Sequence, residues 1–160
     1  MAEFLSSHDW ISWYKNISNR EVLEIIKRCH IGFLPTYEDT YGFCVLEMQA
    51  CGVPVVTTNS NALSEFNNDD CGWIIDMDGY LDTWIIDFWN EEHNISNRVC
   101  NHLRRILKAI FKSAPGDLEK KAMNSIMLIK KNHDIDNYRR KKKKLDILMR
   151  IQILMGRKAR

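Results

Sequence analysis

Short apolar runs alternate with amphipathic stretches in the first half of the chain. Three runs, at residues 31–34, 53–57 and 73–75, are bounded by proline, glycine or polar turns and have the length of buried strands. Ser18 and Glu21 form a capping-box pattern ahead of a helical stripe, made of Val22, Ile25, Ile26 and Cys29. We also expect a short strand at residues 10–17, which are rich in β-forming residues.

A second helix is predicted between Gly42 and Gly52, where Gly52 is placed as its C-terminal stop and Pro54 follows. Strands and helices then alternate in steps of about 20 residues, which predicts right-handed crossovers and a parallel sheet. The fold class expected for the chain is therefore α/β, with a Rossmann-like parallel sheet flanked by helices.

After Gly79 the pattern becomes purely helical. Residues 81–89 are one candidate helix, and Asp134 is placed as the cap of a terminal basic helix over residues 134–160. Two amphipathic stripes lie between them: Val99, Leu103, Ile106, Leu107, Ile110 and Phe111, then Leu118, Ala122, Ile126 and Ile129. We interpret residues 1–160 as a single domain with a helical C-terminal extension.

The composition is that of a globular protein, with 45% apolar and 28% charged residues among 160. No run approaches the ~18 apolar residues of a membrane span, and the first residues do not have the pattern of a signal peptide. A cytoplasmic location is expected. The five cysteines form no Cys-x-x-Cys pair, which argues against a disulfide framework or a zinc site.

Charge is distributed unevenly along the chain. Residues 139–160 hold ten basic residues and one acid, a net charge of +9, whereas the remainder holds 13 basic and 20 acidic residues, a net charge of −7. The run from Arg139 to Lys144 is either a solvated helix face or a peripheral contact with the anionic inner face of a membrane. Nucleic-acid binding is not expected, because the tail lacks interleaved aromatics and the body is acidic.

The loop after the first predicted strand carries the densest chemistry. Glu38 and Asp39 precede Gly42 at a predicted helix start, and Glu47 lies one turn into that helix. Free amides at a helix N-terminus attract phosphate, and carboxylates beside them can accept hydrogen bonds from sugar hydroxyls. In a parallel sheet this loop lies at the carboxyl end of a strand, where ligands bind. The local pattern suits a nucleotide-sugar, although acidic loops that only cap a helix are common.

The wider stretch resembles a known signature. It has a proline-ended strand (Phe33-Leu34-Pro35), two acids eight positions apart with an internal glycine (Asp39, Gly42, Glu47), and then Ala50-Cys51-Gly52-Val53-Pro54-Val55. Together these resemble the signature of the retaining family 4 glycosyltransferases of the GT-B fold. Ala62-Leu63-Ser64-Glu65 is similar to the family's Pro-Glu segment, with Ser64 in place of the proline.

The resemblance implies a donor-binding, carboxy-terminal half of a hexosyltransferase, with a nucleotide-diphosphate sugar as donor and a glycan or glycolipid as acceptor. Polysaccharide biosynthesis is the expected setting. Glu47 would hold the ribose hydroxyls and Asp39 the donor sugar, and these two are the catalytic candidates. Backbone amides would meet the distal phosphate and sugar. The expected donor-binding residues are Glu38, Thr40, Tyr41, Gly42, Phe43 and Glu47.

Two departures from the family pattern matter. The family's first acid is a glutamate, whereas the register set by Glu47 places Asp39 there; Glu38 takes the role only if the loop is one residue longer. The family's acceptor domain, and an Arg and a Lys that neutralise the donor diphosphate, have no counterpart in these residues. A fragment, a truncated gene and one subunit of a split enzyme all remain open, and we expect the chain alone to be inactive.

No cofactor and no metal are expected, because the implied chemistry is metal-independent. Asp76-Met77-Asp78 matches a metal-binding Asp-x-Asp pattern of another glycosyltransferase fold, but acids at a strand end are common in turns. Two alternatives to the transferase stay open: a non-catalytic, degenerate glycosyltransferase-like module, and a GT-B sugar-nucleotide epimerase.

Overall fold

The computed structural model describes residues 7–37, 39, 41–78, 88–133 and 139. Three strands, β1 (Gly32–Leu34), β2 (Val55–Thr58) and β3 (Gly72–Ile75), form a parallel sheet in the order β1-β2-β3. The helices are α2 (Asn19–Ile26), α3 (Phe43–Ala50), α4 (Leu63–Phe66), α5 (Phe88–Lys112) and α6 (Pro115–His133). The prediction of an α/β fold with a parallel sheet is therefore confirmed.

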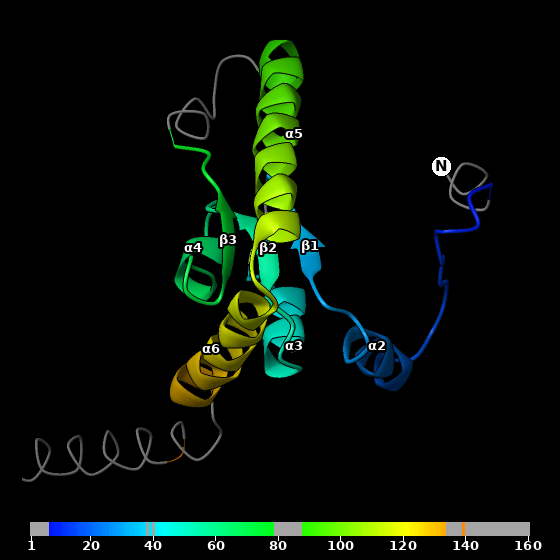
Figure 1. The fold of residues 1–160 in the computed structure, drawn as a ribbon. Coiled ribbons are helices and arrows are strands. Elements are labelled where there is room, and N and C mark those ends of the chain that lie inside the picture. Colours follow the sequence, from blue (N-terminus) through cyan, green and yellow to red (C-terminus); the bar gives the residue numbers. More distant parts are fainter. Residues whose placement is uncertain (1–6, 38, 40, 79–87, 134–138, 140–160) are drawn as a thin grey trace, which may run out of the picture.

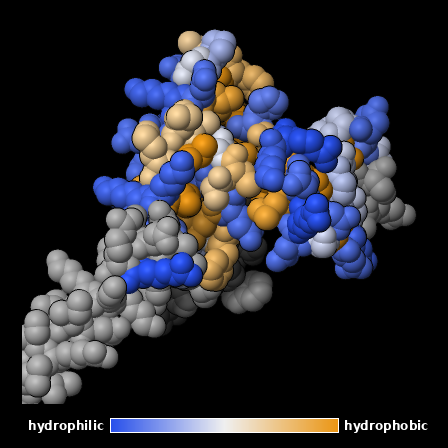
Figure 2. Space-filling model, turned by 90° about the horizontal axis from the view of Figure 1, so that it is seen from below, coloured by the Kyte–Doolittle hydropathy of each residue, from blue (hydrophilic) through white to orange (hydrophobic). Residues whose placement is uncertain are grey.

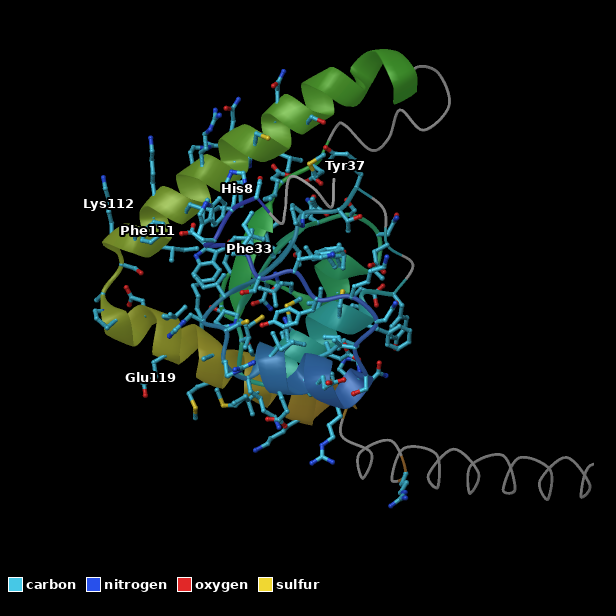
Figure 3. All side chains as sticks on the ribbon, turned by 90° about the vertical axis from the view of Figure 1, so that its right-hand side faces the viewer. His8, Phe33, Tyr37, Phe111, Lys112 and Glu119 are labelled. Atoms are coloured by element: carbon cyan, nitrogen blue, oxygen red, sulfur yellow. The ribbon has the colours of Figure 1, made fainter. Side chains whose placement is uncertain are left out.

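The sheet lies between two layers of helices. Figures 1 and 3 show α5 on one side of the sheet and α2, α3 and α6 on the other. Val56 and Ile75 pack with Val99 on the α5 side, whereas Val55 packs with Val45 and Leu63 on the α3 side. Neighbouring residues of β2 thus face opposite layers, which explains why all four residues of this strand are buried.

Strand β1, at the edge of the sheet, is less buried than predicted. Residues 31–34 were predicted as a buried strand, but Phe33 is 45% exposed. Within the described part of the chain β1 pairs only with β2, so its outer edge carries no further strand. A central strand has a neighbouring strand on each side, whereas an edge strand has one on a single side. An apolar side chain at the edge can therefore remain exposed.

Helix α2 begins as predicted. Ser18 N–H donates to Glu21 Oε2 at 2.8 Å, and Glu21 N–H donates to Ser18 Oγ at 3.4 Å, which confirms the capping box. The hydrogen bonds from the Ser18 backbone and side chain lower the pKa of Glu21. The helix ends at Ile26, so the predicted extension to Cys29 is wrong.

The strand predicted at residues 10–17 is also wrong. These residues are irregular, and Trp10, Trp13 and Tyr14 are all exposed. β-forming side chains favour a strand only where a neighbouring strand packs against them. No described strand pairs with this segment.

The two long helices follow their predicted stripes with one exception. Leu103, Ile106 and Ile110 of α5 pack on the sheet, but Phe111 is 87% exposed. Phe111 lies about 100° around the helix from Ile110, and this rotation carries it off the buried face. Of the candidate helix at 81–89, residues 81–87 lie outside the described residues. So does the terminal basic helix, apart from Arg139.

The side of the molecule formed by α2, α3 and α6 is partly apolar at its surface. Figure 2 shows apolar side chains gathered in the middle of this face. Met123 and Met127 of α6 are both more than half exposed, and α2 has no fully buried residue. No described helix is long and apolar enough to cross a membrane.

Candidate functional site

The site lies in the loop that connects β1 to α3. Thr58, the last residue of β2, donates from its hydroxyl to the Thr36 carbonyl oxygen at 2.6 Å. The Tyr37 hydroxyl lies 3.0 Å from Ser96 Oγ on α5. Figure 3 shows Tyr37 beside α5, above the sheet. The first part of the loop is therefore fastened both to the central strand and to the covering helix.

Gly42 ends the loop and starts α3. Its φ of 71° and ψ of 36° are left-handed, a conformation that costs other residues free energy. A Cβ at this position would also lie 2.7 Å from Leu63 Cδ2. Backbone conformation and packing thus both require the glycine that the motif predicted here. Gly52, with a φ of 76°, confirms the predicted stop of the same helix.

Asp39 holds the turn before α3. Its Oδ1 accepts hydrogen bonds from the backbone N–H groups of Tyr41 at 2.9 Å and Gly42 at 2.6 Å. Two of the three amides predicted to meet the donor are therefore bonded to a carboxylate of the chain itself. An Asp side chain often bonds to amides two or three residues ahead, so the sequence alone carries the signal for this turn.

Glu47 is exposed on α3, one turn after the exposed Phe43. Because residues four apart share a helix face, both side chains lie on the same side of α3. Among the described residues no hydrogen bond or ion pair engages the Glu47 carboxylate. Cys44 follows Phe43 in α3. Burial, and then the negative charge of Asp39, raise the pKa of the Cys44 thiol. Glu38 and Thr40, also predicted to bind the donor, lie outside the described residues.

Aromatic rings surround the helix start. The Tyr41 ring lies 4.5 Å from that of Phe43 and 5.2 Å from that of Phe66, measured between centroids. Phe66 in turn lies 5.6 Å from the His133 ring at the end of α6. Tyr41 and Phe43 remain 42% and 68% exposed. Partly exposed aromatic rings thus flank the start of α3.

A buried polar network lies behind the site, and the sequence reasoning missed it. Gln49 of α3 donates from Nε2 to the Phe66 carbonyl at 2.8 Å, and its buried Oε1 has no hydrogen-bond partner among the described residues. Asn67 donates from Nδ2 to the Val55 carbonyl at 2.9 Å and to Thr57 Oγ1 at 3.0 Å. These bonds join α3, α4 and β2. Gln49 shares the buried face of Val45 one turn earlier, which was the available signal.

Asp76 and Asp78 are held by neighbouring protein groups. Asn59 Nδ2 donates to one oxygen of each carboxylate, at 3.2 and 2.9 Å, and the Arg98 Nε–H donates to the Asp76 carbonyl at 3.0 Å. The hydrogen bond from the Asp78 backbone N–H is the main cause that lowers the pKa of Asp76. Within the described residues, no three potential metal ligands come together. This geometry agrees with a turn at the strand end.

Comparison with known proteins agrees with the α/β fold and its parallel sheet. Residues 1–80, half of the chain, match the family model described as glycosyl transferases group 1. A stretch of 64 residues is 33% identical to the D-inositol 3-phosphate glycosyltransferase of Stackebrandtia nassauensis. This stretch is 40% of the present chain and 14% of that relative's length, so the chain spans a small part of the relative. With the loop, the glycine-started helix and the parallel sheet in place, the chain belongs to the glycosyl transferases group 1 family.

Proposed function

We propose that this chain is the donor-binding part of a retaining glycosyltransferase, which transfers a hexosyl group from a nucleotide-diphosphate sugar to a glycan or glycolipid. One observation carries the proposal. The loop after β1 is fastened at the carboxyl end of a parallel strand and leads, through the left-handed Gly42, into a helix with an exposed acid, Glu47. In open parallel sheets, such a position binds ligands.

In this proposal Glu47 accepts hydrogen bonds from the ribose hydroxyls and Asp39 from those of the donor sugar. The amides of Tyr41, Gly42 and Phe43 receive the distal phosphate and the sugar. The Tyr41 and Gly42 amides are bonded to Asp39 in the structure. Donor binding therefore exchanges one anionic acceptor for another, and frees the Asp39 carboxylate to turn towards the sugar.

Catalysis in this proposal is electrostatic. Fixed amide dipoles at the start of α3 stabilise charge on the departing diphosphate, so no nucleophilic side chain is needed. We further propose that the reaction needs no metal. The cations that neutralise the diphosphate, and the acceptor-binding domain, belong to a part of the enzyme outside these residues. The partly covered apolar face formed by α2, α3 and α6 supports packing against such a part.

Donor binding tests the proposal directly. The purified chain is titrated in a calorimeter with UDP, GDP and ADP and with the nucleotide-diphosphate hexoses that carry these bases. One nucleotide should be preferred. Glu47→Gln should weaken it, whereas Glu119→Gln, at an exposed acid of α6, should leave it within about twofold because Glu119 lies outside the signature and has no assigned contact. If neither the chain nor a complete enzyme that contains it binds any of these ligands, the degenerate, non-catalytic module is the better description.

The purified 160-residue chain is expected to transfer no hexose, even at saturating donor. The physical reason is that the acceptor domain and the diphosphate-neutralising cations are not supplied by these residues. The measurement is transfer of radiolabelled hexose to glycan and glycolipid acceptors, run beside a circular dichroism spectrum that shows the chain is folded. Hexose transfer above the level of a boiled control would contradict the prediction.

A further inference from the structure

The outer face of α5 is strongly basic. Residues 96–112 contain five basic residues and no acid. The four exposed ones are Arg104, Arg105, Lys108 and Lys112. At about 100° per residue, these four fall within an arc of about 100° and point away from the sheet. The opposite side of the same helix packs into the core through Val99, Leu103, Ile106 and Ile110.

Among the described residues, no acidic side chain pairs with the cations of this face. Within the described part of the chain, the recorded ion pairs are Lys27 with Glu24 and Arg98 with Asp76. None of the four exposed cations on α5 takes part in an ion pair or a hydrogen bond there. Burial, and then the charges of Arg105 and Arg98, lower the pKa of the adjacent His102. The face therefore carries a positive potential that an external anion can satisfy.

An apolar edge runs along this basic face. Phe111 is 87% exposed, and Leu107, one turn earlier on the same edge, is half-buried. Figure 3 shows Phe111 and Lys112 together at the end of α5. A basic helix face with an exposed aromatic ring at its edge is typical of helices that lie in the plane of a membrane surface. An aromatic ring gains little by facing a polyanion that offers charge alone, such as a sulfated polysaccharide, but gains free energy when it enters the headgroup region.

We propose that the outer face of α5, formed by Arg104, Arg105, Lys108, Lys112 and Phe111, docks onto an anionic lipid bilayer. The helix lies flat on the surface, the four cations contact lipid phosphates, and the Phe111 ring inserts between headgroups. The described α5 residues from 96 to 112 extend for about 25 Å at 1.5 Å per residue, long enough for several lipids. This inference does not rest on the proposed donor site.

Vesicle flotation of the full chain tests the proposal. We expect the chain to float with vesicles of 30% phosphatidylglycerol and 70% phosphatidylcholine but not with phosphatidylcholine alone, and the binding to fall as salt rises. Each cation near such a surface contributes about fivefold to binding. Arg104→Glu with Lys108→Glu should therefore weaken binding at least tenfold. The basic run at residues 139–144 is unchanged in this variant.

The matched control, called the α2 variant, is Arg20→Glu with Arg28→Glu, which changes the net charge equally at exposed positions in α2 and in the turn after it. It should retain binding within about threefold. Phe111→Ser should weaken vesicle binding several-fold and leave retention on a heparin column unchanged, since heparin offers charge without an apolar layer. Circular dichroism confirms that each variant is folded.

Four results would overturn the proposal. The first is that the wild-type chain does not float with anionic vesicles. The second is that the α5 variant floats as well as wild type, which would place the binding elsewhere. Equal losses in the α5 and α2 variants would show that only net charge matters. If Phe111→Ser has no effect and soluble RNA displaces the vesicles, the face is a polyanion site and not a membrane-docking surface.

Discussion

Gly72→Ala is expected to destabilise the fold by more than about 3 kcal/mol, the upper range for overpacking in a core. A Cβ on Gly72 would lie 2.3 Å from the Val55 carbonyl oxygen and 2.3 Å from Asn67 Oδ1. The Val55 oxygen belongs to the central strand and accepts a hydrogen bond from Asn67, so neither neighbour can move independently. Such a loss is a large part of the 5–15 kcal/mol that stabilises a typical domain.

Gly116→Ala is the matched control for this prediction. A Cβ at Gly116, near the start of α6, would have no atom within 4 Å. Because alanine favours a helix by about 1 kcal/mol over glycine, this variant should be as stable as wild type or slightly more stable. Urea unfolding followed by circular dichroism measures both. A Gly72→Ala midpoint equal to that of wild type would show that β2 and β3 separate easily.

The second large effect concerns the two acids of the proposed donor site, measured in a complete enzyme made by fusing this chain to the acceptor-binding half of a relative. Glu47→Gln should weaken the free nucleoside diphosphate and the full donor alike, since its proposed contact is the ribose. Loss of a hydrogen bond to a charged group costs about 1.5–3 kcal/mol, or about one to two decades in affinity.

Asp39→Asn should instead leave nucleoside diphosphate affinity nearly unchanged and reduce turnover, because its proposed contacts are made at the reacting sugar. The asparagine keeps an oxygen that can accept the Tyr41 and Gly42 hydrogen bonds, so the turn before α3 is preserved. Asp39→Ala removes that acceptor and should also destabilise the helix start by about 1 kcal/mol. This pair separates the structural role of Asp39 from its proposed chemical role.

Calorimetry with nucleoside diphosphate, run beside turnover, distinguishes the possible registers. If Asp39→Asn has no effect on turnover and Glu38→Gln abolishes it, Glu38 is the donor acid and the assignment is shifted by one residue. If both variants retain turnover, the loop carries no catalytic acid and Asp39 serves only the turn that the structure shows.

The sequence alone determined the features that depend on near neighbours in the chain. The capping box joins residues three positions apart, and Gly42 and Gly52 mark the ends of one helix through their own backbone conformation. The three apolar runs correspond to the three strands, because a short apolar run bounded by turn residues is typical of a strand in a parallel sheet. These signals are local, so a single sequence contains them in full.

Only the tertiary structure decided the features that depend on distant pairs. The segment at residues 10–17 has the residue types of a strand, but none of the described strands pairs with it, and Phe33 is exposed because β1 lies at an edge of the described sheet. Gln49 and Asn67 are buried polar side chains whose partners include residues 10 to 18 positions away. Tyr37 meets Ser96 across 59 positions. Such contacts form when the crossovers bring separate segments together, and no local pattern encodes which residues will meet.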